Sequence, residues 1–280
     1  MNILFITNHL NTGGITSYVL TLASGLRKKG HNVYIASSGG ERAFKFKEEG
    51  MDYIPIPMST KKEISLQIIF SLVKLSSIIK KNKIDILHSH SRTTQVLGCL
   101  LEKITGAKHI FTCHGFFKRR LLRRIFPCWG EKVIAISEQV RGHLVKDFEL
   151  DDKKIVVIHN GIDLKRFQAP GTPHPALVKK QLGLSDGPVI GIIARLSDVK
   201  GHQYLIEAMK TILEKYPAAQ LLIIGRGKTE EKLIRLAASL GISSNVFFIP
   251  ETQDTASALA AMDGGNGFRQ SGSRFRCRRN

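Results

Sequence analysis

The stretch MNILFITNHLNTGGITSYVLTLASGLRKKGHNVYIAS, residues 1–37, decides the fold class of this chain. Residues 2–8 form a continuous apolar run, which is typical of a parallel strand buried on both faces. After the glycine-containing loop at 11–14, apolar residues recur at helical spacing over 15–26, and residues 31–37 again read as a strand. A strand, a helix and a second strand in this order predict a βαβ unit, and therefore an α/β fold with a parallel sheet.

The same alternation continues to Asp263. Further strands are predicted at 84–88, 109–113, 132–136 and 155–159, with helices at 64–81, 93–103 and from 138, where Ser137 can cap the helix. A second series follows, with strands at 188–194, 220–224 and 246–249 and helices at 202–216 and 229–240.

Between the two series, residues 168–175 hold three of the nine prolines and a glycine, which is typical of a linker. We therefore predict two Rossmann-like, doubly wound domains, 1–170 and 171–263, with a ligand in the crevice at the carboxyl ends of the strands. Only three strands are predicted for the second domain, so we expect it to be incomplete.

Composition narrows the class of partner. The 280 residues include 42% hydrophobic and 23% charged residues, which is ordinary for a globular protein, but their net charge is +19. Such a charge favours polyanions, namely nucleic acid, anionic lipid or phosphorylated small molecules. The cations are dispersed and no nucleic-acid-binding signature is present, so we expect no nucleic-acid partner.

Other features indicate the cell compartment. No apolar run reaches the ~18–20 residues that span a bilayer, and the first residues do not resemble a signal peptide. The four cysteines show no close pair and no zinc spacing, so we expect reduced thiols in a cytoplasmic protein.

Residues 264–280, GGNGFRQSGSRFRCRRN, differ from the rest of the chain. They contain five arginines, no acidic residue and no apolar periodicity. A disordered basic arm and a frameshifted end both account for this pattern, and we favour the frameshift. In either case we expect an aberrant, disordered tail.

Three groups at predicted strand ends of the first domain are candidates for chemistry. Gly13 and Gly14 lie between a strand and a helix, where backbone N–H groups can hold a phosphate or a sugar hydroxyl, or where a tight turn simply needs glycine. His88 and His90 are spaced for zinc, but no third ligand accompanies them, so we expect no metal site. His114 follows a buried strand and precedes a glycine, so it is either a group that donates to a substrate or a structural histidine.

The sharpest local signal is GIIARLSDVKG, residues 191–201. A buried strand ends near Arg195, and Lys200 follows on a turn that Gly201 closes before a helix. Two cations near a helix N-terminus suit a diphosphate, because arginine offers a fork of donors and lysine a point charge. The alternative is a pair of ordinary solvated loop charges.

Taken in order, NTGGITSYVLTLASGLRKKGHNVYIAS, ILHSHS, FTCHG, VIAISE, VIHNGIDLKRF, GIIARLSDVKGHQYLIEAMK and LLIIGRG resemble glycosyltransferase family 4, from residue 1 to about 263. The resemblance implies a GT-B fold and a transferase that moves a sugar from a nucleotide-sugar donor to an acceptor, with retention at the anomeric carbon and without a metal or cofactor. It also implies an acceptor site mostly in the first domain and a donor site mostly in the second.

The resemblance also implies roles for individual residues. Arg195 and Lys200 match the basic pair that neutralises the donor diphosphate, and His114 matches a histidine near the sugar and the acceptor. The remaining matches are ligand-lining positions: Gly13 and Gly14 in the N-terminal glycine loop, Gly225 and Gly227 beside the nucleotide, and the backbone near Ile249 at the base.

One departure from the family is clear. The family's two glutamates near the donor sugar should follow the strand after Asp263, where this chain has no acidic residue. We therefore expect an impaired, C-terminally truncated or frameshifted enzyme of cell-envelope polysaccharide or lipopolysaccharide synthesis. The alternatives are an inactive remnant and a nucleotide-sugar epimerase of the same fold. The absence of any Asp-x-Asp argues against a metal-dependent GT-A enzyme.

Two segments combine bulky apolar residues with clustered cations, 64–81 and 116–129 (FFKRRLLRRIFPCW). We expect the first to pack on the sheet and the second to lie on anionic lipid, because acceptors in this family are often lipid-linked. The enzyme would then be peripheral at the inner face of the membrane and use a lipid-linked or saccharide acceptor.

Overall fold

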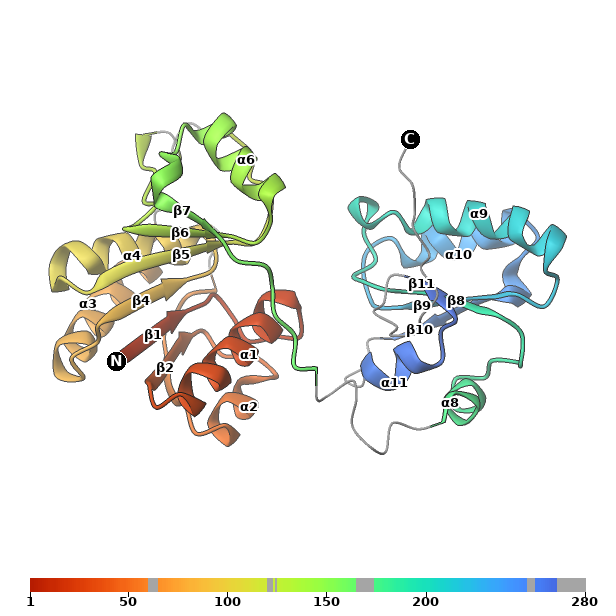
Figure 1. Ribbon diagram of the computed structural model, residues 1–280, viewed down its shortest axis with the longest axis horizontal. Coiled ribbons are helices and arrows are strands. Elements are labelled where there is room, and N and C mark those ends of the chain that lie inside the picture. The colour runs from red at the N-terminus through yellow and green to blue at the C-terminus, as the bar shows by residue number, and fades with distance from the viewer. Residues whose placement is uncertain (60–64, 120–122, 124, 165–173, 251–254, 266–280) are drawn as a thin grey trace. The chain divides into compact units, whose positions relative to one another are not determined.

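A computed structural model describes residues 1–59, 65–119, 123, 125–164, 174–250 and 255–265 of the chain. The chain divides into two compact units, Met1–Ile162 and Asp163–Asn280, and each is built on a parallel sheet (Figure 1). The domain boundary predicted near residue 170 falls within 165–173, which lies outside the described residues.

The first unit contains a seven-stranded sheet of order β3-β2-β1-β4-β5-β6-β7. Its strands are β1 Asn2–Ile6, β2 Asn32–Ser37, β3 Asp52–Pro55, β4 Ile86–Ser89, β5 Lys108–Cys113, β6 Lys132–Ala135 and β7 Ile155–Val157. Its helices are α1 Gly14–Lys28, α2 Ala43–Glu48, α3 Leu66–Lys81, α4 Arg92–Thr105 and α6 Glu138–Phe148, with the 3₁₀ turn η1 Asp152–Lys154. The chain winds outward from β1 to β3 and then returns to β4, so the predicted doubly wound topology is confirmed.

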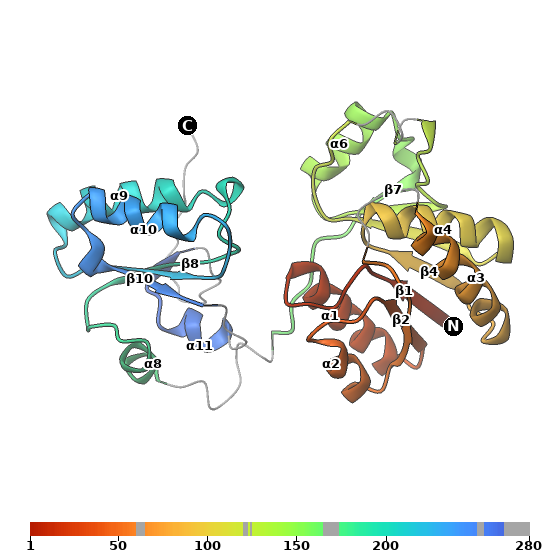
Figure 2. The ribbon, with the colours of Figure 1, turned by 180° about the vertical axis from the view of Figure 1, so that it is seen from behind.

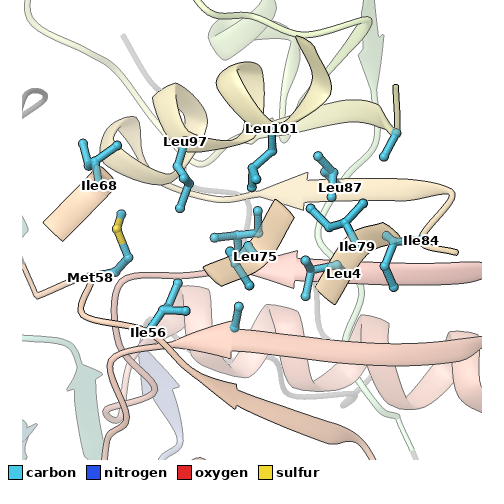
Figure 3. Packing of buried hydrophobic residues seen from close by; sticks show 13 residues of the cluster. Leu4, Ile56, Met58, Ile68, Leu75, Ile79, Ile84, Leu87, Leu97 and Leu101 are labelled. Atoms are coloured by element: carbon cyan, nitrogen blue, oxygen red, sulfur yellow. The ribbon is translucent and has the colours of Figure 1, made fainter. Parts of the chain in front are cut away.

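Helices cover both faces of this sheet, with α1 and α2 on one side and α3 and α4 on the other (Figures 1 and 2). Along β1, Leu4 and Ile6 join the core beneath α3 and α4 (Figure 3), whereas Ile3 and Phe5 join the core with residues of α1. Because successive side chains of a strand point to opposite faces, a strand covered on both sides must be apolar throughout. The apolar run at the start of the chain has this origin.

The second unit contains a four-stranded sheet of order β10-β9-β8-β11. Its strands are β8 Val189–Ile193, β9 Gln220–Ile224, β10 Val246–Ile249 and β11 Gly264–Gly265. Its helices are α8 Pro175–Gln181, α9 His202–Lys215, α10 Glu230–Ser239 and α11 Thr255–Ala260, with the 3₁₀ turns η2 Asp198–Lys200 and η3 Ser243–Asn245. The first three strands are those predicted from the sequence.

The strand β11 corrects the prediction that regular structure stops at Asp263. Gly264 and Gly265 pair in parallel with β8. Asp263 prepares this pairing, because its N–H donates to the carbonyl of Val189 at 2.7 Å and its carboxylate accepts from the N–H of Val189 at 3.0 Å. Residues 266–280 lie outside the described residues, so the disordered tail and the frameshift stay predictions.

No element was predicted between residues 38 and 62. The structure contains α2 and β3 in this segment, and Phe46 of α2 is fully buried. A helix of six residues is too short to show a clear 3.6-residue periodicity, which explains the omission.

The described cysteines, Cys99, Cys113 and Cys128, are free thiols in the structure. Cys99 and Cys128 are far apart in the sequence but meet in the fold, where a hydrogen bond between their thiols lowers the pKa of Cys99 to about 7. No helix among the described residues combines the length and the apolarity that a bilayer crossing requires.

Candidate functional site

Three histidines gather where β4 and β5 end. His88 lies on β4, His90 follows β4, and His114 follows β5. Parallel neighbours end at the same edge of a sheet, so residues 24 positions apart meet: His88 Nε2 lies 2.7 Å from the Thr112 hydroxyl, and His90 Nδ1 lies 3.2 Å from His114 Nε2. The sequence placed these histidines at this edge but did not predict that they touch. Among the described residues, no group of three or more His, Cys, Asp or Glu residues is arranged to hold a metal ion.

Burial keeps this imidazole cluster neutral. Desolvation lowers the pKa of His88 to about 3 and that of His114 to about 4, and it also lowers the pKa of His90. A neutral imidazole carries one proton, so each ring offers one donor and one acceptor nitrogen. The cluster can therefore orient hydrogen bonds at neutral pH but cannot supply positive charge to a diphosphate.

Lowering the pH from 7 to 5 is expected to destabilise the first unit. His88, His109 and His114 have folded pKa values of about 3, 4 and 4, against a usual 6.5, so the unfolded chain binds more protons in this window. The free energy of unfolding should be highest near neutral pH and fall by up to ~1.4 kcal/mol per pH unit for each of these histidines as the pH drops below 6.5.

Trp129 provides the measurement for this prediction. It is the single tryptophan of the chain and is buried in the first unit, so urea unfolding followed by its fluorescence reports on that unit. A free energy of unfolding that does not change between pH 7 and pH 5 would contradict a neutral cluster.

A pocket of about 310 Å³ opens beside His90. It lies at the carboxyl ends of β1 and β4, the two neighbouring strands between which the winding of the sheet reverses. Doubly wound sheets commonly bind ligands at this edge, and the prediction of a ligand here stays a prediction. The lining offers hydroxyl, amide and imidazole groups and comes from Thr7, Asn8, His9, Ile15, Thr16, Ser59, His90, Ser91, Arg92 and Thr93.

The walls of this pocket are held by a polar network. The Asn8 amide donates to the carbonyl of Met58 at 2.9 Å and contacts the Thr93 hydroxyl at 2.8 Å. Ser91 begins α4 through a capping box with Thr94, which places the N-terminus of α4 at the rim. The pocket is therefore preorganised by groups that are already hydrogen-bonded to one another.

Gly13 and Gly14 begin α1 at the same edge of the sheet. Gly13 has an extended φ of 163°, which any residue adopts, and Gly14 is the first helical residue. A Cβ at either position would meet no heavy atom within 4 Å. The fold therefore does not require glycine here, which contradicts the tight-turn interpretation and leaves the backbone open to an approaching ligand.

Sequence reasoning missed two residues of this cluster. Tyr18 of α1 stands edge-on to His114, with ring centroids 4.9 Å apart, and Thr112 contacts His88. Burial raises the pKa of Tyr18. In the sequence, Tyr18 is marked only by its place on the helix after the glycine loop. Its neighbours share that place, so the sequence does not single it out.

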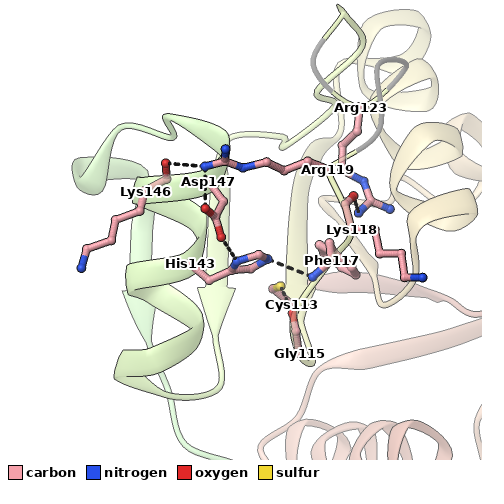
Figure 4. A network of polar contacts seen from close by, with 9 residues as sticks. All are labelled: Cys113, Gly115, Phe117, Lys118, Arg119, Arg123, His143, Lys146 and Asp147. Atoms are coloured by element: carbon pink, nitrogen blue, oxygen red, sulfur yellow. Dashed lines mark hydrogen bonds and ion pairs between the residues drawn. The ribbon is translucent and has the colours of Figure 1, made fainter. Parts of the chain in front are cut away.

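The loop that carries His114 is supported from α6 (Figure 4). The Cys113 thiol donates to the carbonyl of Gly115 at 3.2 Å, and the N–H of Phe117 donates to His143 Nε2 at 2.9 Å. Asp147 in turn binds His143 and forms an ion pair with Arg119. This network orders the start of the segment 116–129.

In the basic loop of the second unit, the strand end, the turn and the helix lie where the sequence predicts them, and the joint binding of a diphosphate by the two cations stays a prediction. The strand β8 ends at Ile193, Arg195 follows two residues later, and Lys200 ends η2. Gly201 then adopts a left-handed φ of 74° directly before α9, which explains why glycine is needed there. Both cations are exposed, and neither side chain has a hydrogen-bond or ion-pair partner within the part of the chain that the structure describes. They are available to an anion.

Gly225 and Gly227 contact protein backbone. A Cβ at Gly225 would lie 2.1 Å from the carbonyl oxygen of Ala194, and one at Gly227 would lie 1.9 Å from that of Leu196. These glycines let the loop after β9 pack closely on the loop that contains Arg195. The carbonyl of Ile249 accepts from the N–H of Gly225 at 3.0 Å, and its predicted contact with a base stays a prediction.

Comparison with known proteins identifies relatives of both units. The model of Glycosyltransferase Family 4 matches residues 12–166, which is more than half of the chain, and the model of Glycosyl transferases group 1 matches residues 176–263. An uncharacterized glycosyltransferase of Haemophilus influenzae is 27% identical over 263 residues, covering 90% of this chain and 69% of the relative. An Escherichia coli UDP-Gal:alpha-D-GlcNAc-diphosphoundecaprenol alpha-1,3-galactosyltransferase is 29% identical over 210 residues, covering 69% and 54%.

A solved structure shows the same fold. Anabaena Alr3699/HepE, determined with UDP and glucose, has a TM-score of 0.80 at 19% identity over 95% of this chain and 73% of its own. The chain spans about two thirds of the length of the Haemophilus influenzae relative and about half of that of the Escherichia coli relative. Each unit is a Rossmann-like domain of the GT-B type, as predicted.

Proposed function

Because the chain belongs to glycosyltransferase family 4, we propose that it transfers a sugar from a nucleotide-sugar donor to a lipid-linked or glycan acceptor. The names of two relatives support this class of reaction. One uses a UDP-sugar and a diphosphoundecaprenol-linked acceptor, and a Staphylococcus aureus relative serves capsular polysaccharide biosynthesis. We place the reaction in the assembly of cell-envelope polysaccharide or lipopolysaccharide.

The observation that carries this proposal is the pair of exposed cations after β8, whose side chains have no partner among the residues that the structure describes. Arg195 and Lys200 are held by a strand end, a 3₁₀ turn and the left-handed Gly201. Positive charge at this point stabilises the diphosphate as the bond between sugar and phosphate breaks. The donor is a substrate, and the proposed chemistry retains the anomeric configuration and assigns no metal or cofactor.

The acceptor belongs, in this proposal, to the pocket of the first unit. Its accessible lining is mostly apolar but includes hydroxyl and amide side chains that can bind saccharide hydroxyls, and the exposed backbone at Gly13 and Gly14 adds N–H groups. His114 offers a neutral imidazole to a sugar or acceptor oxygen. Donor and acceptor groups of this kind give orientation and specificity in small-molecule sites.

The proposal is tested by incubating the purified chain with a panel of UDP-, GDP- and ADP-sugars and with undecaprenyl-diphosphate-linked saccharides. Mass spectrometry detects the product, and NMR of the new linkage reports retention or inversion. Turnover at ordinary enzyme rates would contradict the inactive remnant, whereas donor binding in a calorimeter without transfer would support it. Isomerised donor in the absence of acceptor would indicate an epimerase, and an absence of binding to every donor would refute the proposal.

We also propose that the enzyme works on an anionic membrane surface at the inner face of the membrane. The outer side of α3 supports this proposal, because Leu66, Ile69, Phe70 and Val73 form an apolar stripe whose members are 55–71% exposed. Lys80 and Lys81 end the same helix. An exposed apolar stripe beside lysines is typical of a helix that lies in a lipid interface.

This surface differs from the one expected from the sequence. The segment 116–129 was expected to lie on lipid, yet Trp129 is buried, and Arg123 is buried with its guanidinium 4.3 Å from the ring centroid of Phe117. Phe116, Ile125 and Phe126 remain exposed, and residues 120–122 and 124 lie outside the described residues. The helix expected only to pack on the sheet is therefore the stronger candidate.

Replacing Phe70 and Val73 together by serine is expected to weaken binding to phosphatidylglycerol-containing vesicles at least about tenfold, because two exposed apolar side chains no longer enter the lipid. Co-sedimentation measures the bound fraction. Ile234→Ser, which removes an exposed apolar side chain from α10, is the matched control and should bind as the native chain does. Equal binding by all three proteins would contradict the α3 surface, and binding that ignores lipid charge would contradict the role of the lysines.

A further inference from the structure

Aromatic rings on several sides hold the imidazole of His90 in one orientation. Its side chain is buried, and its ring stacks on Phe5 with centroids 5.7 Å apart and an angle of 11° between the planes. The rings of His88 and Tyr18 lie 4.3 and 5.7 Å away. These contacts fix the plane of the imidazole, and so they fix the direction of its hydrogen bond to His114.

Two neutral rings in hydrogen-bond contact share one proton between their facing nitrogens. Burial lowers the pKa of both histidines, to about 4 for His114, so both rings are neutral at pH 7. His90 Nδ1 and His114 Nε2 are 3.2 Å apart, and one of these nitrogens must donate to the other. The ring that accepts this hydrogen bond must carry its own proton on its other nitrogen, so the direction of the bond decides the tautomer of both rings.

The surroundings of His90 Nε2 distinguish the two arrangements. This nitrogen is buried and has no hydrogen-bond partner within the described part of the chain. If His114 were the donor, His90 would carry its own proton on Nε2 as an orphaned buried N–H, which is a rare and costly state in proteins. If His90 donates through Nδ1, its Nε2 carries only a lone pair.

We propose that His90 is a positioning residue that donates its Nδ1–H to Nε2 of His114 and thereby holds His114 as the Nδ1–H tautomer. In this tautomer the proton of His114 is carried on Nδ1, and in this proposal that N–H is the group that donates to a ligand oxygen. Within the proposed function, His114 then acts as a hydrogen-bond donor to a sugar or acceptor oxygen. It does not act as a general base through Nε2, since that lone pair is already occupied.

The tautomer can be observed directly in the full chain labelled with ¹⁵N-histidine. Long-range ¹H–¹⁵N correlation spectra at pH 7.5 should show the Nδ1–H pattern for His114, assigned by its loss in His114→Gln. Observation of the Nε2–H pattern in the native chain would overturn the proposal. Because this readout needs no substrate, failure of the proposed transferase activity leaves it intact, and the two outcomes remain distinguishable.

Variants of His90 test whether this residue sets the tautomer of His114. His90→Phe keeps a flat ring but removes the donor, so the His114 tautomers should redistribute. His90→Asn places an amide N–H near the position of Nδ1 and should restore the native pattern. With an accepted donor, His90→Phe should lower kcat about tenfold with little change in the donor KM, and His90→Asn should recover most of that loss.

His31→Phe serves as the control, because His31 precedes β2 at the opposite edge of the sheet, where its ring lies 3.4 Å from the N-terminal amine. Trp129 fluorescence verifies that each variant is folded. An unchanged His114 tautomer in a folded His90→Phe protein would show that His90 does not set it.

Discussion

Replacement of Arg195 by alanine is expected to lower kcat about 10²–10³-fold, the usual loss when a charge stabiliser is removed from a departing anion. The side chain is exposed and has no partner within the described residues, so its removal should not disturb the fold. Because the charge on the diphosphate grows as the bond breaks, the loss should appear more in kcat than in the donor KM. Steady-state rates with a nucleotide sugar that the native chain accepts measure it.

Two further variants sharpen this test. Arg195→Lys keeps the charge but loses the forked pair of donors, so its kcat should lie between that of Arg195→Ala and that of the native chain. Lys215→Ala, at the far end of α9, removes an equally exposed cation of the same unit and should leave the rate unchanged. Equal rates for Arg195→Ala and Lys215→Ala would remove the diphosphate assignment.

Gly227→Ala is expected to have the second largest effect. The new Cβ would lie 1.9 Å from the carbonyl oxygen of Leu196. Because this oxygen belongs to the backbone, it cannot move aside as the end of a flexible side chain can. Overpacking of this kind costs about 1–3 kcal/mol, and displacement of the Arg195 loop by about 1 Å can cost up to about 100-fold in rate.

Hydrogen exchange measures this displacement. In the native chain, the N–H groups of Ala194 and Leu196 donate to the carbonyls of Ile224 and Arg226, both at 3.0 Å. In Gly227→Ala these two amides should exchange faster, together with the loss of rate. Gly25→Ala is the matched control, because a Cβ there meets nothing within 4 Å and alanine favours the helix by about 0.5–1 kcal/mol. Native exchange at Ala194 and Leu196 in Gly227→Ala would contradict the packing role.

The glycines illustrate how far a motif can be interpreted. Four of them were predicted to face a ligand because they match one family, yet the structure separates them into two kinds. Gly13 and Gly14 border open space, whereas Gly225 and Gly227 are pressed against the backbone of a neighbouring loop. Their residue type is the same, and only the position of the neighbouring loop shows that Gly225 and Gly227 also have a packing role.

Local periodicity was sufficient for the α/β class, for most of the strands and for the loop that holds Arg195 and Lys200. These features depend on residues a few positions apart, whose relation is set by strand and helix geometry. Short elements such as α2, with six residues, and β11, with two, were not predicted, because so few residues cannot establish a periodicity.

Contacts between distant segments required the folded chain. The hydrogen bond from His90 to His114 depends on the register of β4 against β5, and the exposed stripe of α3 depends on which side of that helix meets the sheet. Alternation along one strand or helix carries no information on such pairings, because they are selected by the packing of the whole unit. The chain's own pattern therefore established the fold family and the basic loop, and tertiary packing alone determined which histidine orients which and which glycines are free to meet a ligand.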